Sequence, residues 1–98
     1  MLITISAKHM TLSERMVGSI RRKVGRLTKY FDKVQQFAVI VERMRRGYHV
    51  EIRSDVERHD DFISTCDHED LLACIDLAVD RSARQLTDHK SKTRRRRR

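Results

Sequence analysis

Residues 34–56 read VQQFAVIVERMRRGYHVEIRSDV, two runs of alternating apolar and polar residues joined by a basic turn. A period of two residues is typical of strands that bury one face and leave the other in water. Gly47 lies in the turn, where it tolerates the positive φ that a tight hairpin connection requires. This stretch therefore predicts an antiparallel hairpin with strands over residues 34–44 and 48–56.

Two further strands flank the hairpin in the sequence. Residues 1–8 alternate with the same period and are rich in β-branched side chains. Two aspartates at 60 and 61 end the hairpin, and residues 62–66 form a shorter apolar run. We expect both segments to be strands, which gives a sheet of four.

Each of the two helical segments has one apolar stripe. The first runs to about Tyr30, and both Thr11 and Ser13 offer an N-cap, so its start is left open. The second begins at Asp67 or His68, helped by acidic residues in its first turn, and ends near Lys90. Apolar spacing of i, i+3/i+4 and i+7 marks the buried sides. The stripe of the second helix is Leu71, Leu72, Ile75, Val79, Ser82 and Leu86.

The order of elements is β-α-β-β-β-α, an α+β fold in a single domain over residues 1–92. Because each helix has one apolar stripe, both helices should pack on the same face of the four-stranded sheet. The opposite face is left open to water or to a partner. Residues 93–98 form a disordered polyarginine tail in this prediction.

Charge is the first indication of function. The 98 residues contain 22 Lys and Arg against 14 Asp and Glu, a net charge of +8. The last five residues are all arginine, and without them 17 basic residues face 14 acidic ones, a net charge of +3. The position of the charges, rather than their sum, therefore has to support any nucleic-acid interface.

The sequence favours a cytoplasmic protein. No stretch approaches the roughly 20 apolar residues that a membrane-spanning helix needs, and the first apolar run is too brief for a signal peptide. Two cysteines, Cys66 and Cys74, are too few for a disulfide scaffold, and we expect them to be reduced core residues.

The first helix has a basic stripe. At 100° per residue, four cations fall between about 220° and 280° from Met16, opposite the apolar side. They are Arg15, Arg22, Arg26 and Lys29. A solvated surface would explain such a stripe, but soluble helix faces usually mix charges of both signs. A row of positive side chains without carboxylates, most of them guanidinium groups, is better suited to binding phosphates than to solubility alone. Gly18 and Gly25 lie near this face, and close approach of RNA and simple tolerance explain them equally well.

The second helix and the tail add further cations. Arg81 and Arg84 lie on one flank of the apolar stripe, and Lys90 and Lys92 lead into the tail. The candidate RNA contacts are therefore Arg15, Arg22, Arg26, Lys29, Arg81, Arg84, Lys90 and Lys92, with tail contacts from Arg94, Arg95, Arg96, Arg97 and Arg98. Such a tail gathers around a polyanion, although it also increases solubility.

Nothing in the sequence indicates catalysis. Cys66, His68 and Cys74 lack the second pair of ligands that a zinc site normally shows. No P-loop, nucleophile elbow or paired-glycine motif occurs. We therefore expect no enzymatic activity, metal, cofactor or small-molecule substrate. Aromatic residues arranged for base stacking are also absent from the predicted surface, which argues against sequence-specific reading of single strands.

One block of sequence resembles a known family. HEDLLACIDLAVDR at residues 68–81, followed by RQL and HK, resembles the second helix of bacterial ribosome hibernation-promoting factors, also called ribosome-associated inhibitors or sigma-54 modulation proteins. YFDKV at 30–34 and ITISAKH at 3–9 match the same family. The resemblance extends to about Lys92. The turn at 57–61 lacks the glycine common in the family, and the arginine tail is unusually pure.

The resemblance implies a protein that binds in the decoding region of the small ribosomal subunit. There it would contact rRNA, compete with mRNA and tRNA, and silence idle ribosomes during starvation or stationary phase. This chain resembles the short form, and whether a helper factor pairs the silenced ribosomes is left open. The family's contacts, projected onto this sequence, favour Arg22, Arg26, Lys29, Arg81, Arg84 and Lys90.

Two alternatives remain at this stage. A general RNA-binding or transcription-associated modulator would bind arbitrary structured RNA or polymerase components with comparable affinity. A protein-interaction adaptor would use the open sheet face, and its binding would be insensitive to salt. The hibernation hypothesis predicts binding to the small subunit that weakens steeply with salt.

Overall fold

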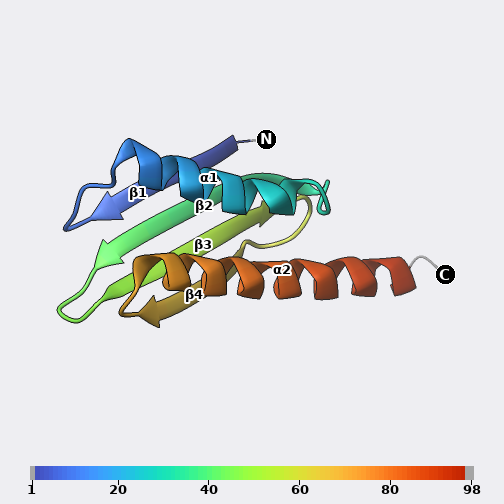
Figure 1. Ribbon diagram of the computed structural model, residues 1–98. Helices are drawn as coiled ribbons and strands as arrows, with labels where there is room; N and C mark the ends of the chain where they lie inside the picture. Colours follow the sequence, from blue (N-terminus) through green and yellow to red (C-terminus); the bar gives the residue numbers. More distant parts are fainter. Residues whose placement is uncertain (1, 97–98) are drawn as a thin grey trace.

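The computed structural model describes residues 2–96, with side chains over residues 2–93. The element order is β-α-β-β-β-α, as predicted, and the α+β class is confirmed (Figure 1). The elements are β1 (Leu2–Lys8), α1 (Glu14–Thr28), β2 (Val34–Arg43), β3 (Tyr48–Val56), β4 (Phe62–His68) and α2 (Leu71–Arg96).

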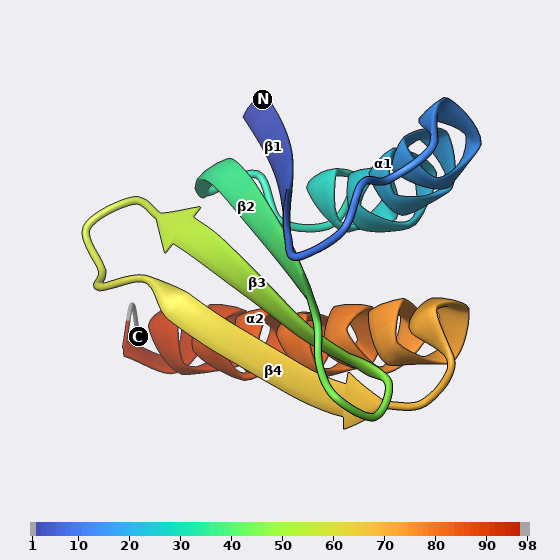
Figure 2. The ribbon, with the colours of Figure 1, turned by 90° about the vertical axis from the view of Figure 1, so that its left-hand side faces the viewer.

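The four strands form one sheet in the order β1-β2-β3-β4. β1 and β2 are parallel, and the α1 crossover connects them. β2, β3 and β4 pair antiparallel, which confirms the predicted hairpin. Figure 2 shows the strong twist of the sheet, because β1 and β4 run in clearly different directions. α1 packs against β1, and α2 packs against β3 and β4.

The cap of α1 resolves the choice between Thr11 and Ser13. The Ser13 side chain accepts a hydrogen bond from the Met16 backbone nitrogen at 3.1 Å, and the helix begins at Glu14. Ser13 is extended, with φ −69° and ψ 159°, which is the usual conformation of an N-cap residue. The helix ends at Thr28, slightly earlier than the sequence predicted.

The start of α2 differs from the prediction. β4 continues to His68 rather than ending at Cys66, because His68 still pairs with Tyr48 of β3. The helix therefore begins at Leu71, and a start at Asp67 or His68 is wrong. Asp70 caps it, since its side chain accepts a hydrogen bond from the Ala73 nitrogen at 3.3 Å. The acidic residues predicted for the first turn thus precede the helix.

The far end of α2 also differs. The helix extends to Arg96, well past the end near Lys90 that the sequence predicted, and its second half projects beyond the sheet (Figure 1). Residues 97 and 98 and the side chains of residues 94–96 lie outside the described part of the chain. The tail contacts predicted for Arg94 to Arg98 therefore stay a prediction.

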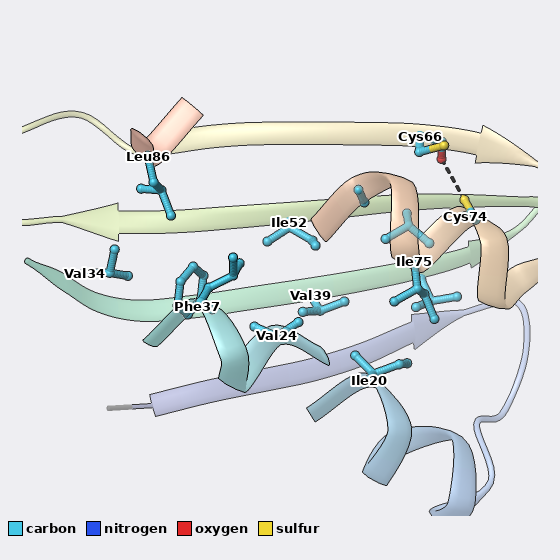
Figure 3. Packing of buried hydrophobic residues seen from close by; sticks show 14 of the residues in the cluster. Ile20, Val24, Val34, Phe37, Val39, Ile52, Cys66, Cys74, Ile75 and Leu86 are labelled. Atoms are coloured by element: carbon cyan, nitrogen blue, oxygen red, sulfur yellow. Dashed lines mark hydrogen bonds between the residues drawn. The ribbon is translucent and has the colours of Figure 1, made fainter. Parts of the chain in front are cut away.

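The core lies between the sheet and the two helices (Figure 3). Phe37 and Ile52 from the central strands meet Val24 of α1 and Ile75 of α2. The predicted stripe of α2 is right except at Leu72, whose side chain is 42% exposed. Cys74 and Ala78 are fully buried in α2 instead, because the helix turns its small residues toward β4 and β3.

Candidate nucleic-acid interface

The four cations of the α1 stripe all lie on the outer side of the helix. Ile20, Val24 and Leu27 are buried on the opposite side, which fixes the direction in which the cations point. Arg15, Arg22, Arg26 and Lys29 are all exposed. Over residues 2–93, no hydrogen bond or ion pair involves any of these four side chains. The stripe is therefore unpaired positive charge, as phosphate binding requires.

The two cations that flank the stripe are used within the fold. Arg21 donates from Nη1 to the carbonyl oxygen of Ile3 on β1 at 3.0 Å. Lys23 pairs with Asp76 of α2, with 2.5 Å between Nζ and Oδ1. The sequence places these residues beside the stripe, and the structure shows why they are not part of it.

The candidate cations on α2 divide into two groups. Arg84 and Lys92 are exposed, and within the described chain their side chains have no polar partner. Arg81 donates from Nη1 to the carbonyl oxygen of Thr65 on β4. Lys90 donates from Nζ to the carbonyl oxygen of Tyr30 at 3.1 Å. Arg81 and Lys90 therefore stabilise the fold as well as carrying charge.

Side chains from the helices cover both outer edges of the sheet. Arg21 donates to a carbonyl oxygen of β1, and Arg81 donates to one of β4. Gln85 donates from Nε2 to the Ile63 carbonyl oxygen of β4 at 2.9 Å. Open edges invite pairing with a further strand, and charged or polar cover discourages it. These three edge carbonyls are therefore occupied from within the chain and are not free to pair with a further strand.

A groove of about 650 Å³ runs between the two helices. It brings Arg26 and Lys90 together, along with the Lys23–Asp76 pair. Asp80 also lines the groove, so its walls carry both signs of charge. Arg81 does not reach the groove, because it lies on the side of α2 that faces the β4 edge.

The open face of the sheet has a different charge. The strand register places Lys8 and Arg53 on this face against four carboxylates. The carboxylates are Glu42, Glu51, Asp55 and Asp67. Arg53 pairs with Glu51, with 2.8 Å between Nε and Oε2, and His49 contacts Asp67. The two faces of the protein therefore differ in sign, and the open face is unsuited to phosphates.

Tyr30 is the functional candidate that the sequence analysis missed. Its side chain is 66% exposed at the end of α1 and lines the groove between the helices. It meets Phe31 edge to face, with ring centroids 6.5 Å apart. Its exposure could have been predicted from the sequence, because Tyr30 follows the last apolar residue of the α1 stripe and its ring has no buried position to occupy. An exposed ring beside cations can stack on a nucleobase.

The two cysteines are buried and free, as predicted. Cys74 donates from Sγ to the carbonyl oxygen of Cys66 at 3.0 Å (Figure 3). Burial, together with the neighbouring Cys66, raises the pKa of the Cys74 thiol to about 12. The described residues contain no cluster of three or more His, Cys, Asp or Glu that could hold a metal ion. Neither described helix is apolar over a length that would cross a membrane.

Comparison with known proteins supports the resemblance noted in the sequence. Residues 3–94 match the model of the family described as sigma 54 modulation protein / S30EA ribosomal protein. The chain belongs to this family. Apart from the first residue of β1 and the last two of α2, the match includes all four strands and both helices, so the unpaired α1 stripe and the groove lie within the family's domain.

Relatives of this S30EA family member are named ribosome hibernation promoting factor. One from Azotobacter vinelandii is 28% identical over 92 residues, covering 94% of this chain and 85% of the relative. One from Escherichia coli K12 is 28% identical over 95 residues, covering 94% and 96%. Two solved structures share the fold. A ribosomal subunit interface protein from Coxiella burnetii gives a TM-score of 0.85 at 15% identity, covering 93% of this chain and 99% of that one. The N-terminal domain of Protein Y from Thermus thermophilus gives 0.80 at 23% identity, covering 91% and 99%.

Proposed function

We propose that this protein is a ribosome-binding translation inhibitor that stabilises inactive ribosomes. Its helix layer would contact rRNA in the decoding region of the small subunit, where it excludes mRNA and tRNA. The protein would act in the cytoplasm, under starvation or in stationary phase, and without catalysing a reaction. The names of its relatives support the hibernation role.

The observation that carries the proposal is the unpaired stripe on α1. Arg15, Arg22, Arg26 and Lys29 follow one side of a helix of 15 residues and its C-cap, and the stripe contains no carboxylate. At 1.5 Å per residue, the four side chains extend over roughly 20 Å, which corresponds to several successive phosphates. A helix that only needed solubility would pair such charges with carboxylates at i+4.

The polarity of the whole molecule supports the same orientation. Carboxylates outnumber cations on the open sheet face, whereas the α1 side of the helix layer is basic. A polyanion would orient the protein with the helices toward it and the sheet away from it. In this orientation the open sheet face does not contact the RNA and stays exposed on the bound protein.

Co-sedimentation with separated small and large ribosomal subunits tests the proposal. Binding is measured across a salt series, with initiator tRNA and mRNA as competitors. We expect saturable binding to the small subunit that is displaced by both competitors and weakens steeply with salt. Weak, unsaturable binding to both subunits would instead indicate a general RNA binder.

Charge-reversal variants locate the interface. Arg22→Glu with Arg26→Glu should abolish small-subunit binding, since both side chains are exposed and unpaired. Lys8→Glu with Arg53→Glu makes the same change in net charge on the open sheet face and should retain binding. Thermal unfolding of both variants shows whether the fold is intact. Equal loss of binding in the two variants would contradict the proposed orientation.

A further inference from the structure

A second cavity lies where α2 projects past the sheet, and its volume is about 580 Å³. Three parts of the chain form its walls: residues 31–34 between α1 and β2, residues 56–59 at the β3–β4 turn, and the last turns of α2. Its size is within the range of small-molecule and cofactor sites. It is separate from the α1 stripe, and of the groove residues it shares only Phe31 and Lys90.

The floor of the cavity is apolar and its rim is charged. Phe31, Val34, Val56 and Leu86 line the floor, and all but the half-buried Phe31 are buried core residues. Lys33, Arg58 and Lys90 line the rim with the carboxylates Asp32 and Glu57. No described hydrogen bond or ion pair engages the side chains of Asp32, Lys33, Glu57 or Arg58. On the rim, Lys33 and Arg58 are therefore cations without an ion-pair partner in the described chain, and the three cations outnumber the two carboxylates.

Three stacked or edge-packed rings stand beside the cavity. The His59 ring lies parallel to that of Phe62, with centroids 4.5 Å apart and 12° between the planes. His89 of α2 meets both of them edge-on or tilted, at 4.7 and 5.3 Å. His59 and His89 line the cavity, so a flat ligand would meet aromatic surface at one wall.

The walls are held together by specific contacts. The Glu57 nitrogen donates to the Lys33 carbonyl oxygen at 2.9 Å, which joins the β3–β4 turn to the α1–β2 connection. Lys90 donates to the Tyr30 carbonyl oxygen, which joins the same connection to α2. The cavity is therefore formed before any ligand arrives, which lowers the entropy lost on binding.

The β3–β4 turn places an arginine at a strained backbone position. Arg58 has φ 60°, in the left-handed region that favours glycine. A side chain in this region costs about 1–2 kcal/mol, so stability alone would favour glycine here. Strained residues tend to gather at binding sites. In this turn the backbone directs a guanidinium to the rim of an apolar cavity.

We propose that this cavity binds one nucleotide, with the base on the apolar floor beside the histidine rings and the phosphate among Lys33, Arg58 and Lys90. An apolar floor beside aromatic rings suits a flat base, and a rim with three cations suits a phosphate. The nucleotide is either free or one unit of an RNA strand, because both present the same chemistry. The proposal does not depend on ribosome binding.

NMR titration of the complete chain with 5′-GMP and 5′-AMP tests the site. We expect saturable shifts of the amides around the cavity, at residues 31–34, 56–59 and 86–90. Guanosine and inorganic phosphate should each bind at least about tenfold more weakly, since each supplies only half of the contacts. A trinucleotide that binds more tightly than 5′-GMP would assign the site to RNA, and equal or weaker binding would assign it to free nucleotides.

Arg58→Gly is the decisive variant, because it removes the cation and relieves the positive φ at once. We expect it to fold at least as well as the parent and to bind 5′-GMP about tenfold more weakly. Arg46→Gly removes one cation from the exposed β2–β3 turn, where the residue has no positive φ, and should leave binding unchanged. Absent shifts with millimolar nucleotide, or equal shifts with phosphate alone, would overturn the proposal. Ribosome binding is measured separately, so either proposal can fail without the other.

Discussion

Lys23 of α1 and Asp76 of α2 form the one ion pair that the described chain shows between the two helices, with 2.5 Å between Nζ and Oδ1. The lysine is largely covered and the aspartate about half exposed. Because α2 packs on β3 and β4 while α1 packs on β1, this pair bridges the groove between the two helices. The relationship has consequences for stability and for RNA affinity.

We predict a modest energetic coupling between these two side chains. Lys23→Ala and Asp76→Ala should each lower the free energy of unfolding by about 0.5–1 kcal/mol, and the double variant should lose less than the sum. Urea unfolding measures the cycle at low and high salt, and the coupling should shrink as salt increases. Additive losses at low salt would mean that the pair does not hold the helices together.

The carboxylates in the groove should weaken RNA binding. Asp80 lines the groove beside Arg26 and Lys90, and the described structure gives its side chain no ion-pair partner. We predict that Asp80→Asn raises the affinity for the small subunit severalfold at low salt, because it removes a negative charge next to the phosphates. Asp88→Asn, outside the groove on the same helix, is the matched control. An equal gain from both variants would mean that only net charge matters.

Periodicity was sufficient to predict the elements and most of the core. Alternation in residues 34–56 predicted the hairpin, and the register confirms the sides of Phe37, Val39 and Val41. The start of α2 was misplaced because carboxylates near a helix can lie in its first turn or before it. The sequence cannot show whether Asp70 is the N-cap or a residue of the first turn, since both positions favour aspartate.

The candidate interface was predictable on α1 and less so on α2. The angular position of each residue around the α1 axis, taken from the sequence, places Arg22 and Arg26 away from the core, and both side chains are exposed in the structure. The angular positions around one helix do not predict which side chains contact other helices or strands. The hydrogen bonds of Arg81 to β4 and of Lys90 to Tyr30 depend on the packing of distant segments. The cavity at the end of α2 combines three such segments, so no local pattern indicates it.

Replacing Gly47 and Gly25 with alanine should change the free energy of unfolding in opposite directions. A Cβ on Gly47 would lie 2.5 Å from the His68 carbonyl oxygen, and φ at Gly47 is +91°. We predict that Gly47→Ala lowers the free energy of unfolding by at least about 2 kcal/mol, because backbone on both sides must move. Apart from its own stretch of helix, no part of the protein lies within 4 Å of where a Cβ would stand at Gly25, so Gly25→Ala should stabilise α1 by up to about 1 kcal/mol.

Gly25→Ala also separates the two explanations left open for the helix glycines. If RNA backbone passes close to α1 at this point, the stabilised variant should bind the small subunit more weakly. If the glycine is simply tolerated, affinity should be unchanged while the melting temperature rises. Thermal unfolding and co-sedimentation on the same preparation give both values.

The buried Cys74 thiol should make stability depend on pH in the alkaline range. Its pKa is raised from 9.0 to about 12, first by burial and then by the adjacent Cys66. Between these two values the unfolded chain releases the thiol proton and the folded chain keeps it, so the free energy of unfolding falls as pH rises. Stability from this group is intact below pH 9 and is lost progressively between about pH 9 and 12.

Urea unfolding of the parent and of Cys74→Ala across this pH range measures the effect. The titrations of Lys and Tyr occur in both proteins and cancel in the difference between the two pH profiles. The variant should be less stable at pH 8, because it loses buried contacts, but its stability should decline less steeply from pH 9 to pH 11. Alkylation supplies an independent check, since at pH 8 a thiol of pKa about 12 is ionised in roughly one molecule in ten thousand. Iodoacetamide should therefore modify Cys74 only on unfolding. Parallel pH profiles, together with rapid alkylation of the native protein, would show that the thiol is neither desolvated nor protected by the β4–α2 packing.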